Sequence, residues 1–338
     1  MSAKIDRLTA STLNRFSGVR LDRLVDYRED ASWQKQQLKN QNTRLVPLWR
    51  SRCLVEKTAD QNYEAVYVHP SELQQYNVIR EPTLLGKKDD QVYFAVTVND
   101  QQREHLLKHH NNSEFSDLRI LAGDMHPLKA GILAYAKALH YWQHRHTFCG
   151  TCGAANILHS GGHRMVCSND ECGRQTFPRI DPAIIVLVSH GDACLLGRQA
   201  RWPINRFSTL AGFVEPGESL EDAVVREIWE EARVRLKTIS YRSSQPWPFP
   251  AAAMAGFIAE AESRDCEIGD NELEAIRWFS SKELPQLLAK GEIYMPNRVS
   301  IAFQLVSEWY LGQTGDDLRQ LIREMQPSGP GRHNKNTC

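Results

Sequence analysis

Three glutamates in one short stretch could together hold a hard metal ion: Glu227, Glu230 and Glu231. They follow Ser219 and Asp222, whose types and spacing predict a capping box that opens a helix. At 100° per residue, Glu227 and Glu231 continue a stripe that begins with apolar residues, and Glu230 lies to its side. Carboxylates along a buried stripe repel one another and lose solvation, which Mg²⁺ or Mn²⁺ would relieve. Because such an ion polarises a phosphoryl oxygen and activates water, the pattern predicts metal-assisted phosphate chemistry.

The alternative interpretation of this stretch is a solvated, glutamate-rich helix interleaved with arginine. A bare Glu-x-x-Glu-Glu is more often that kind of helix. Here a glycine-rich turn, Gly212–Gly217, precedes the helix at a defined interval and favours the metal site.

Four cysteines form a second cluster with the spacing of metal ligands. Cys149 and Cys152 form one Cys-x2-Cys pair, and fourteen residues later Cys167 and Cys172 form a Cys-x4-Cys pair. Two thiolate pairs beside glycine-containing turns satisfy Zn²⁺ tetrahedrally and leave no position open for water. We therefore expect a structural zinc ion. The alternatives are four unrelated buried cysteines or a nucleic-acid-binding ribbon.

The secondary-structure elements that position these two clusters can be predicted from hydrophobic patterns. Up to about residue 125, β-rich runs predict a small β-containing domain without a catalytic constellation; they are Arg44–Trp49, Glu64–Val68 and Val92–Val98. A helical period predicts a helix over residues 128–145.

From residue 182 the pattern is α/β. Ala183–Val188 and Ala193–Gly197 predict a hairpin, and the carboxylate helix is expected at Ser219–Ala232. Further strands are expected at residues 239–243, 254–259 and 275–279, and a final helix at residues 298–311.

Composition narrows the class of protein. The chain has 338 residues, which predicts two domains with a small insert, and Lys+Arg balance Asp+Glu at 41 each. A protein that relied on nonspecific nucleic-acid or membrane contacts would show a basic excess. No apolar run approaches the ~20 residues of a membrane span, and no signal peptide is recognisable. We expect a soluble, cytoplasmic protein with no membrane partner and a disordered tail at residues 326–338.

The carboxylate stretch resembles the Nudix box, Gly-x5-Glu-x7-Arg-Glu-U-x-Glu-Glu-x-Gly-U, where U is bulky and apolar. The matching positions are Gly212, Glu218, Arg226, Glu227, Ile228, Glu230, Glu231 and Val234. Arg233 stands where the box has its final glycine. That glycine would end the helix in a left-handed conformation, which costs any other residue ~1 kcal/mol.

The resemblance implies roles for these residues. Glu227, Glu230 and Glu231 would be the catalytic metal ligands, with the carbonyl of Ala211 as a further ligand. Glu218 and Arg226 would orient the carboxylates. A later glutamate would complete the set, with Glu272 as the candidate and Glu274 as its rival.

After the box comes a Pro-aromatic run in which prolines alternate with Trp247 and Phe249. Proline stiffens the run, so the rings are presented at little ordering cost and suit stacking on a base. With the preceding four cysteines, the run resembles the NADH pyrophosphatase branch of the Nudix superfamily. That branch continues with a polar residue and Ser, where this chain has Ala251 and Ala252.

The branch resemblance also implies a set of substrate contacts. They are Gln245, Pro246, Trp247, Pro248, Phe249, Pro250, Ala251, Ala252, Phe177, Phe213, Ala302 and Arg119. The implied fold is an α/β (α+β) Nudix sandwich, α/β/α with a mixed sheet. We expect an N-terminal β-containing domain at 1–125, a linking helix at 126–147, the zinc ribbon at 148–178 and the Nudix domain at 179–315.

The implied activity is metal-dependent hydrolysis of the diphosphate of NADH, and also of NAD⁺ and related dinucleotides, giving AMP and nicotinamide mononucleotide. Mg²⁺ or Mn²⁺ would be the catalytic cofactor, Zn²⁺ the structural one, and the protein a homodimer. One alternative is removal of the NAD cap from RNA by the same site, which needs a local basic patch because the overall charge is neutral. An alternative of another class is a zinc-ribbon nucleic-acid-binding regulator with an inactive Nudix domain.

Overall fold

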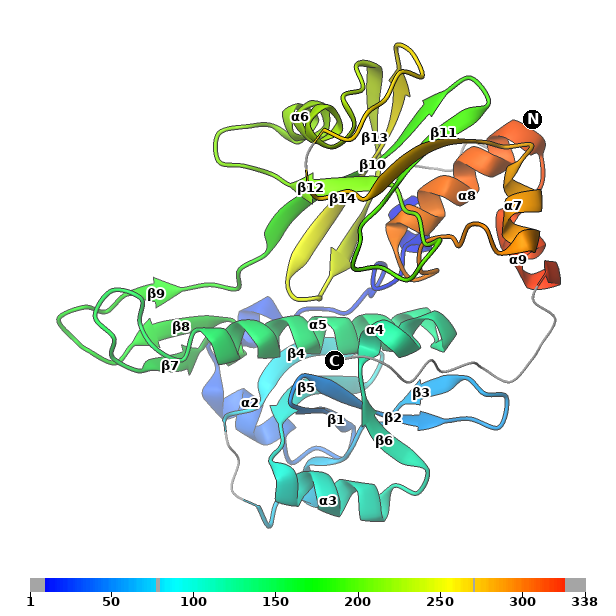
Figure 1. Ribbon diagram of the computed structural model, residues 1–338. Helices are drawn as coiled ribbons and strands as arrows, with labels where there is room; N and C mark the ends of the chain where they lie inside the picture. Colours follow the sequence, from blue (N-terminus) through cyan, green and yellow to red (C-terminus); the bar gives the residue numbers. More distant parts are fainter. Residues whose placement is uncertain (1–9, 77–79, 270, 326–338) are drawn as a thin grey trace. The chain divides into compact units, whose positions relative to one another are not determined.

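The computed structural model of the protein describes residues 10–76, 80–269 and 271–325. The predicted disordered tail, residues 326–338, lies outside them. The chain divides into two compact units (Figure 1). Of the described residues, unit 1 comprises Ala183–Ser243 and residues 255–325, and unit 2 comprises residues 10–182 and Ser244–Met254.

Unit 1 is built on a mixed sheet with the strand order β13-β14-β10-β11-β15, and β12 also pairs with β10. Its strands are β10 Asp181–His190, β11 Ala193–Arg198, β12 Leu210–Phe213, β13 Leu236–Trp247, β14 Ala252–Ala261 and β15 Ala275–Ser280. Its helices are α6 Leu220–Ala232, α7 Leu284–Lys290, α8 Ile301–Thr314 and α9 Leu318–Met325. The expected β10–β11 hairpin is confirmed, since Val188 pairs with Leu195 and His190 with Ala193.

The two faces of this sheet carry different helices (Figure 1). Alternate residues such as Ile184, Val186 and Phe257 pack with α6 in one core. Gly256, the neighbour of Phe257, faces the other way, because a Cβ there would lie 2.6 Å from Ile301 of α8. The expected α/β/α sandwich is therefore confirmed. The helix expected at residues 298–311 is α8, which starts at Ile301 because Ser300 is its N-cap. It is not the final helix, since α9 follows it.

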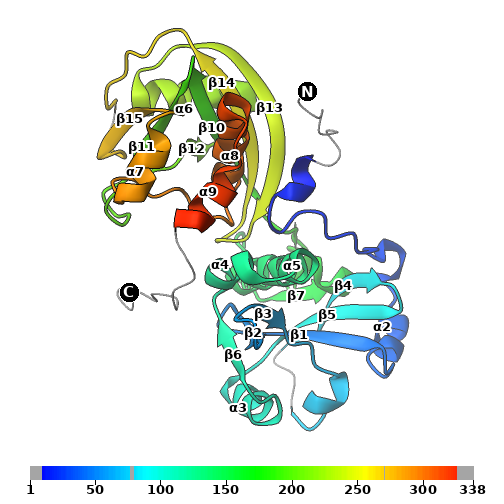
Figure 2. The same cartoon turned by 90° about the vertical axis from the view of Figure 1, so that its right-hand side faces the viewer.

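Unit 2 contains a sheet in the order β3-β2-β1-β5-β4, with β6 paired to β2. The strands are β1 Thr43–Trp49, β2 Arg52–Lys57, β3 Tyr63–Ala65, β4 Thr83–Lys88, β5 Gln91–Thr97 and β6 Ser113–Ser116. The helices are α2 Ala31–Gln37, α3 Asp100–His109, α4 Leu118–Leu121 and α5 Pro127–Arg145. Within the unit, α5 and α3 cover opposite sides of the sheet (Figure 2). The strand expected at Glu64–Val68 is shorter, and Val68 only bridges Leu45.

Two sequence-based boundaries differ from this grouping. The helix expected as a linker, α5, packs on the strands of unit 2, with Ile132, Leu133 and Leu139 buried. The ribbon strands β7 Asn156–His159, β8 Arg164–Cys167 and β9 Gln175–Thr176 form a three-stranded sheet in the same unit. The apolar stripe of α5 is thus covered by the sheet of unit 2.

Candidate metal and substrate site

The acidic cluster of unit 1 is organised around helix α6. Ser219 caps the helix, and its side chain and that of Asp222 form the expected capping box. Glu227 of this helix faces the strand β12. A Cβ on Gly212 would lie 1.9 Å from the Glu227 carboxyl, so only glycine allows this approach.

Arg226 connects the carboxylates. Its guanidinium donates to Glu218 at 2.6 Å, to Glu227 at 2.9 Å and to Glu230 at 3.0 Å. It also donates to the carbonyl of Phe213 at 3.0 Å, which ties the helix to the end of β12. This shared cation offsets the repulsion between the carboxylates.

The acidic residues differ in their surroundings. Glu231 is buried, with 2% of its surface exposed, whereas Glu230 is exposed. Burial raises the pKa of Glu227, Arg226 opposes this, and the charges of Glu230 and Glu272 add to the rise. Arg226 lowers the pKa of Glu218 to about 2. Carboxylate oxygens on two successive helical turns suit a divalent cation, which would share Glu227 and Glu230 with Arg226.

Glu272 and Glu274 have different partners. Glu274 forms an ion pair with Arg198, which lies mostly buried on β11. The carboxylate of Glu272 lies close enough to raise the pKa of Glu227. The ion pair of Glu274 and the electrostatic effect of Glu272 on Glu227 favour Glu272 as the additional acidic residue of the site.

Helix α6 ends in the left-handed conformation that the missing glycine would adopt. Arg233 has φ 54° and ψ 23°. Its guanidinium donates to the carbonyl of Gly269 at 2.8 Å and to that of Trp229 at 3.2 Å. These bonds hold the helix exit although the residue is not glycine.

Two other expected substrate contacts in unit 1 differ in their exposure to solvent. Phe213 is 61% exposed next to the acidic cluster, so its ring is available for stacking. Ala302 is buried in the first turn of α8, where its backbone N–H donates to Ser300. The alanine side chain is therefore part of the core.

The four cysteines of unit 2 form a compact group. Their Sγ atoms all lie within 4.8 Å of one another, with Cys149–Cys172 at 3.8 Å and Cys152–Cys167 at 3.4 Å. Of all the residues that the structure describes, this is the only group of three or more His, Cys, Asp or Glu gathered so closely. Four thiolates at such distances can hold a tetrahedral metal ion.

We call Ser244–Met254 the aromatic loop; it contains the Pro-aromatic run and belongs to unit 2. Trp247 and Phe249 contact each other edge to face at 5.1 Å between ring centroids. The Arg119 guanidinium lies 5.8 Å from the Trp247 ring and 5.0 Å from the Phe249 ring. The structure therefore brings together three of the expected substrate contacts. Phe177, also in unit 2, is 62% exposed.

Sequence reasoning missed the segment that holds this loop. Phe16 is buried and contacts Trp247 at 6.4 Å and Phe249 at 5.8 Å between ring centroids. The amide of Asn14 donates to the carbonyl of Ser244, and Gln245 donates to the carbonyl of Arg15. These contacts explain why the loop groups with unit 2 although the sequence boundaries put it within residues 179–315.

Comparison with known proteins completes the description of the site. A family model described as a NUDIX domain matches residues 178–298, and one described as an NADH pyrophosphatase-like rudimentary NUDIX domain matches residues 42–142. "NAD-capped RNA hydrolase NudC" of Pseudomonas fluorescens is 40% identical over 201 residues, 57% of this chain and 71% of that protein. The chain belongs to the Nudix family.

Two other relatives have related names. "NAD-capped RNA hydrolase NUDT12" of Macaca fascicularis is 37% identical over 229 residues, 64% of this chain and 50% of the relative. "NAD-capped RNA hydrolase NudC" of Pseudomonas syringae is 46% identical over 162 residues, 48% of this chain and 58% of the relative. The chain thus spans about half the length of the primate relatives that it matches.

The Nudix assignment fits both units. The NUDIX match covers β10 to β15 and helix α6 of unit 1, and the rudimentary NUDIX match covers β1 to β6 and most of α5 in unit 2. No described helix is long and apolar enough to cross a membrane. The segment that anchors the aromatic loop, residues 11–17, precedes both Nudix matches.

Proposed function

We propose that this Nudix protein hydrolyses the diphosphate bond of NADH, and of NAD⁺ and related dinucleotides, to AMP and nicotinamide mononucleotide. The observation that carries the proposal is the carboxylate cluster on α6, with Arg226 bonded to Glu218, Glu227 and Glu230. The names of the relatives support the same bond as the target, because an NAD cap contains it.

Glu227, Glu230 and Glu231 would hold Mg²⁺ or Mn²⁺, together with the carbonyl of Ala211 and with Glu272. When bound, the cation supplies neutralisation of the diphosphate charge and activation of water. One of these carboxylates would accept the proton that the attacking water releases, and Arg226 would keep the carboxylates oriented. The exposed ring of Phe213 and the rings of the aromatic loop and Phe177 would bind the bases. Zn²⁺ would occupy the four-cysteine cluster as a structural ion.

The test is product analysis with NADH, NAD⁺, ADP-ribose, diadenosine polyphosphate and NAD-capped RNA, with Mg²⁺ and with Mn²⁺. Glu231→Gln should lower turnover of every substrate by at least ~100-fold, because a buried ligand loses its charge. Glu221→Gln removes the same charge from an exposed position on the same helix and should be neutral. Near-normal activity of Glu231→Gln with zinc retained would refute the proposed metal site.

Removal of the NAD cap from RNA is the second candidate function, and the names of the relatives favour it. The ratio of kcat/KM for capped RNA to that for free NADH decides between the two substrates. The alternative of a nucleic-acid-binding regulator requires binding without hydrolysis, and the full set of carboxylates on α6 argues against it.

We also propose that the protein is a homodimer that shares its aromatic loop between subunits, as the family resemblance implies. Sedimentation velocity of the full chain would give a monomer if this is wrong. The absence of serine at Ala252, which is half-buried in the loop, should weaken the preference for NADH over NAD⁺. Ala252→Ser should increase that preference.

A further inference from the structure

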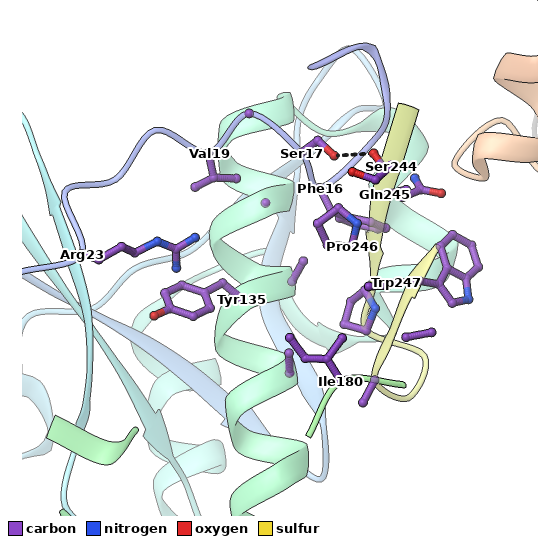
Figure 3. A pocket seen from close by; sticks show the side chains of 18 of the residues that line it. Phe16, Ser17, Val19, Arg23, Tyr135, Ile180, Ser244, Gln245, Pro246 and Trp247 are labelled. Atoms are coloured by element: carbon purple, nitrogen blue, oxygen red, sulfur yellow. Dashed lines mark hydrogen bonds between the residues drawn. The ribbon is translucent and has the colours of Figure 1, made fainter. Parts of the chain in front are cut away.

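Unit 2 contains a cavity of about 730 Å³ that is lined partly by the aromatic loop and partly by residues outside the expected site. One wall is the segment from Phe16 to Arg28, and helix α5 forms the floor with Tyr135. The aromatic loop contributes Pro246 and Trp247, and Ile180 lies beside them (Figure 3). All these residues belong to the same unit. The cavity is large enough for a nucleotide.

The charged residues that line the cavity are all arginines: Arg20, Arg23, Arg28 and Arg179. Arg179 is paired with Asp181 at 2.5 Å, but no described acidic side chain forms an ion pair with the other three. Glu29, next to Arg28, pairs with Arg164 instead. The cavity therefore carries a local positive charge in a protein whose formal net charge is zero.

Two observations concern the surroundings of the Arg23 and Arg28 guanidinium groups. The Nε of Arg28 is buried and has no hydrogen-bond partner among the described residues. The pKa of His163 falls to about 4, chiefly because its ring is buried and in part because Arg28 and Arg23 are close. An anion in the cavity would relieve both conditions.

Apolar side chains make up much of the remaining lining. Arg23 lies over the Tyr135 ring, 3.8 Å from its centroid, and Figure 3 shows the two side by side. Pro246, Trp247 and Ile180 supply further apolar surface. Aromatic side chains next to arginines are a combination that binds single-stranded nucleic acid, through base stacking and phosphate contacts.

Hydrogen bonds join two walls of the cavity, the aromatic loop and the N-terminal segment that contains Phe16. Ser244 of the aromatic loop donates to the Ser11 hydroxyl at 3.1 Å and accepts from Asn14 at 2.9 Å. Arg15 donates to the carbonyls of Gly123 and Met125. The aromatic loop thus forms part of this cavity and, by family resemblance, part of the dinucleotide site.

We propose that this arginine cavity binds the first nucleotides of the RNA chain that follow an NAD cap. The inference rests on the proposed function, because the dinucleotide must be held by the same aromatic loop. The cavity would recognise a phosphate together with a base. A free mononucleotide carries the same two groups as the RNA chain. The chain would be recognised by backbone phosphates at Arg23 and Arg28 and by stacking on the apolar walls, without sequence specificity.

Direct binding tests this without hydrolysis. A fluorescent 5′-phosphorylated hexaribonucleotide should bind the full chain, and the double variant Arg23→Gln/Arg28→Gln should lose that binding. If two phosphates are contacted, the double variant should also lose a salt dependence of roughly sevenfold between 50 and 200 mM salt. The variant Arg23→Lys/Arg28→Lys keeps both positive charges and should therefore keep most of the salt-dependent binding of the hexaribonucleotide. The control Arg52→Gln/Lys57→Gln removes two exposed charges from β2 of the same unit and should bind like wild type.

Activity then separates the two proposals. The Arg23→Gln/Arg28→Gln variant should lower kcat/KM for capped RNA by about sevenfold or more at low salt and leave kcat/KM for free NADH within about twofold. Equal losses for both substrates, or the same loss in the β2 control, would overturn the cavity proposal. AMP binding as tightly as the hexamer would also overturn it, because a mononucleotide site needs no chain. Hexamer binding by a protein that hydrolyses no dinucleotide would refute the proposed function alone.

Discussion

At the scale of single residues, the contacts of Arg226 determine how the acidic site responds to pH. Its pairing lowers the pKa of Glu218 from 4.5 to about 2. A carboxyl group whose pKa is lower in the folded than in the unfolded state stabilises the folded state above pH 4.5. This stabilisation is lost as the pH falls toward 2. The same guanidinium serves Glu227 and Glu230, so the orientation of the site depends on it.

Glu218→Gln should therefore melt at a lower temperature than wild type near pH 7, and the two curves should converge as the pH approaches 2. Thermal unfolding monitored by circular dichroism between pH 2 and 7 measures this. Glu221→Gln on the same helix is the matched control. A wild-type and Glu218→Gln pair with parallel curves over the whole range would mean that the ion pair does not form.

At the scale of elements, the end of α6 shows how a side chain compensates for backbone strain. The left-handed Arg233 costs ~1 kcal/mol relative to glycine, while its guanidinium bonds to Gly269 and Trp229. Arg233→Gly should change stability little, whereas Arg233→Ala loses the bonds and keeps the strain. Urea denaturation should find the Gly variant more stable than the Ala variant by about 1 kcal/mol. Equal stability of the two would show that the helix ends elsewhere.

The anchoring of the aromatic loop belongs to the same scale. Phe16→Ala removes the ring that packs on Trp247 and Phe249, so the loop should lose its position. We expect kcat/KM for NADH to fall by about tenfold or more, since misplaced contacts are costly, and Phe16→Leu to recover part of it. Leu13→Ala, at an exposed site of the same segment, is the control. Steady-state kinetics with zinc content as a folding check would reject the anchor if Phe16→Ala behaves like Leu13→Ala.

At the scale of the whole molecule, the two proposed metal sites belong to different units and should respond separately to substitution. Cys152→Ser should release zinc and lower the melting temperature by roughly 5 °C or more, because the ribbon loses its main cross-link. Cys266→Ser lies outside the cluster and should retain the metal. Atomic absorption and calorimetry measure both effects. Full zinc content in Cys152→Ser would show that the four cysteines are not the ligands.

Much of the fold of unit 1 could be predicted from local sequence. The β10–β11 hairpin, the α6 capping box and the left-handed end of α6 depend on residues within a few positions of one another. Helices α7 and α9 were not predicted. The mostly buried α8 was predicted, because one long apolar run is a strong signal even without a polar face.

The sequence alone therefore determined the chemistry: which residues could hold metal, and which rings could stack on a base. Those features are local, because the ligands lie on one helix or on two short knuckles. Only the tertiary structure decided where the aromatic loop belongs, since Asn14 meets Ser244 across 230 positions of the chain. It also favoured Glu272 over Glu274, and it gathered the arginines of residues 20–28 and Arg179 around one cavity. Such contacts depend on packing between distant segments, which no periodicity or spacing records.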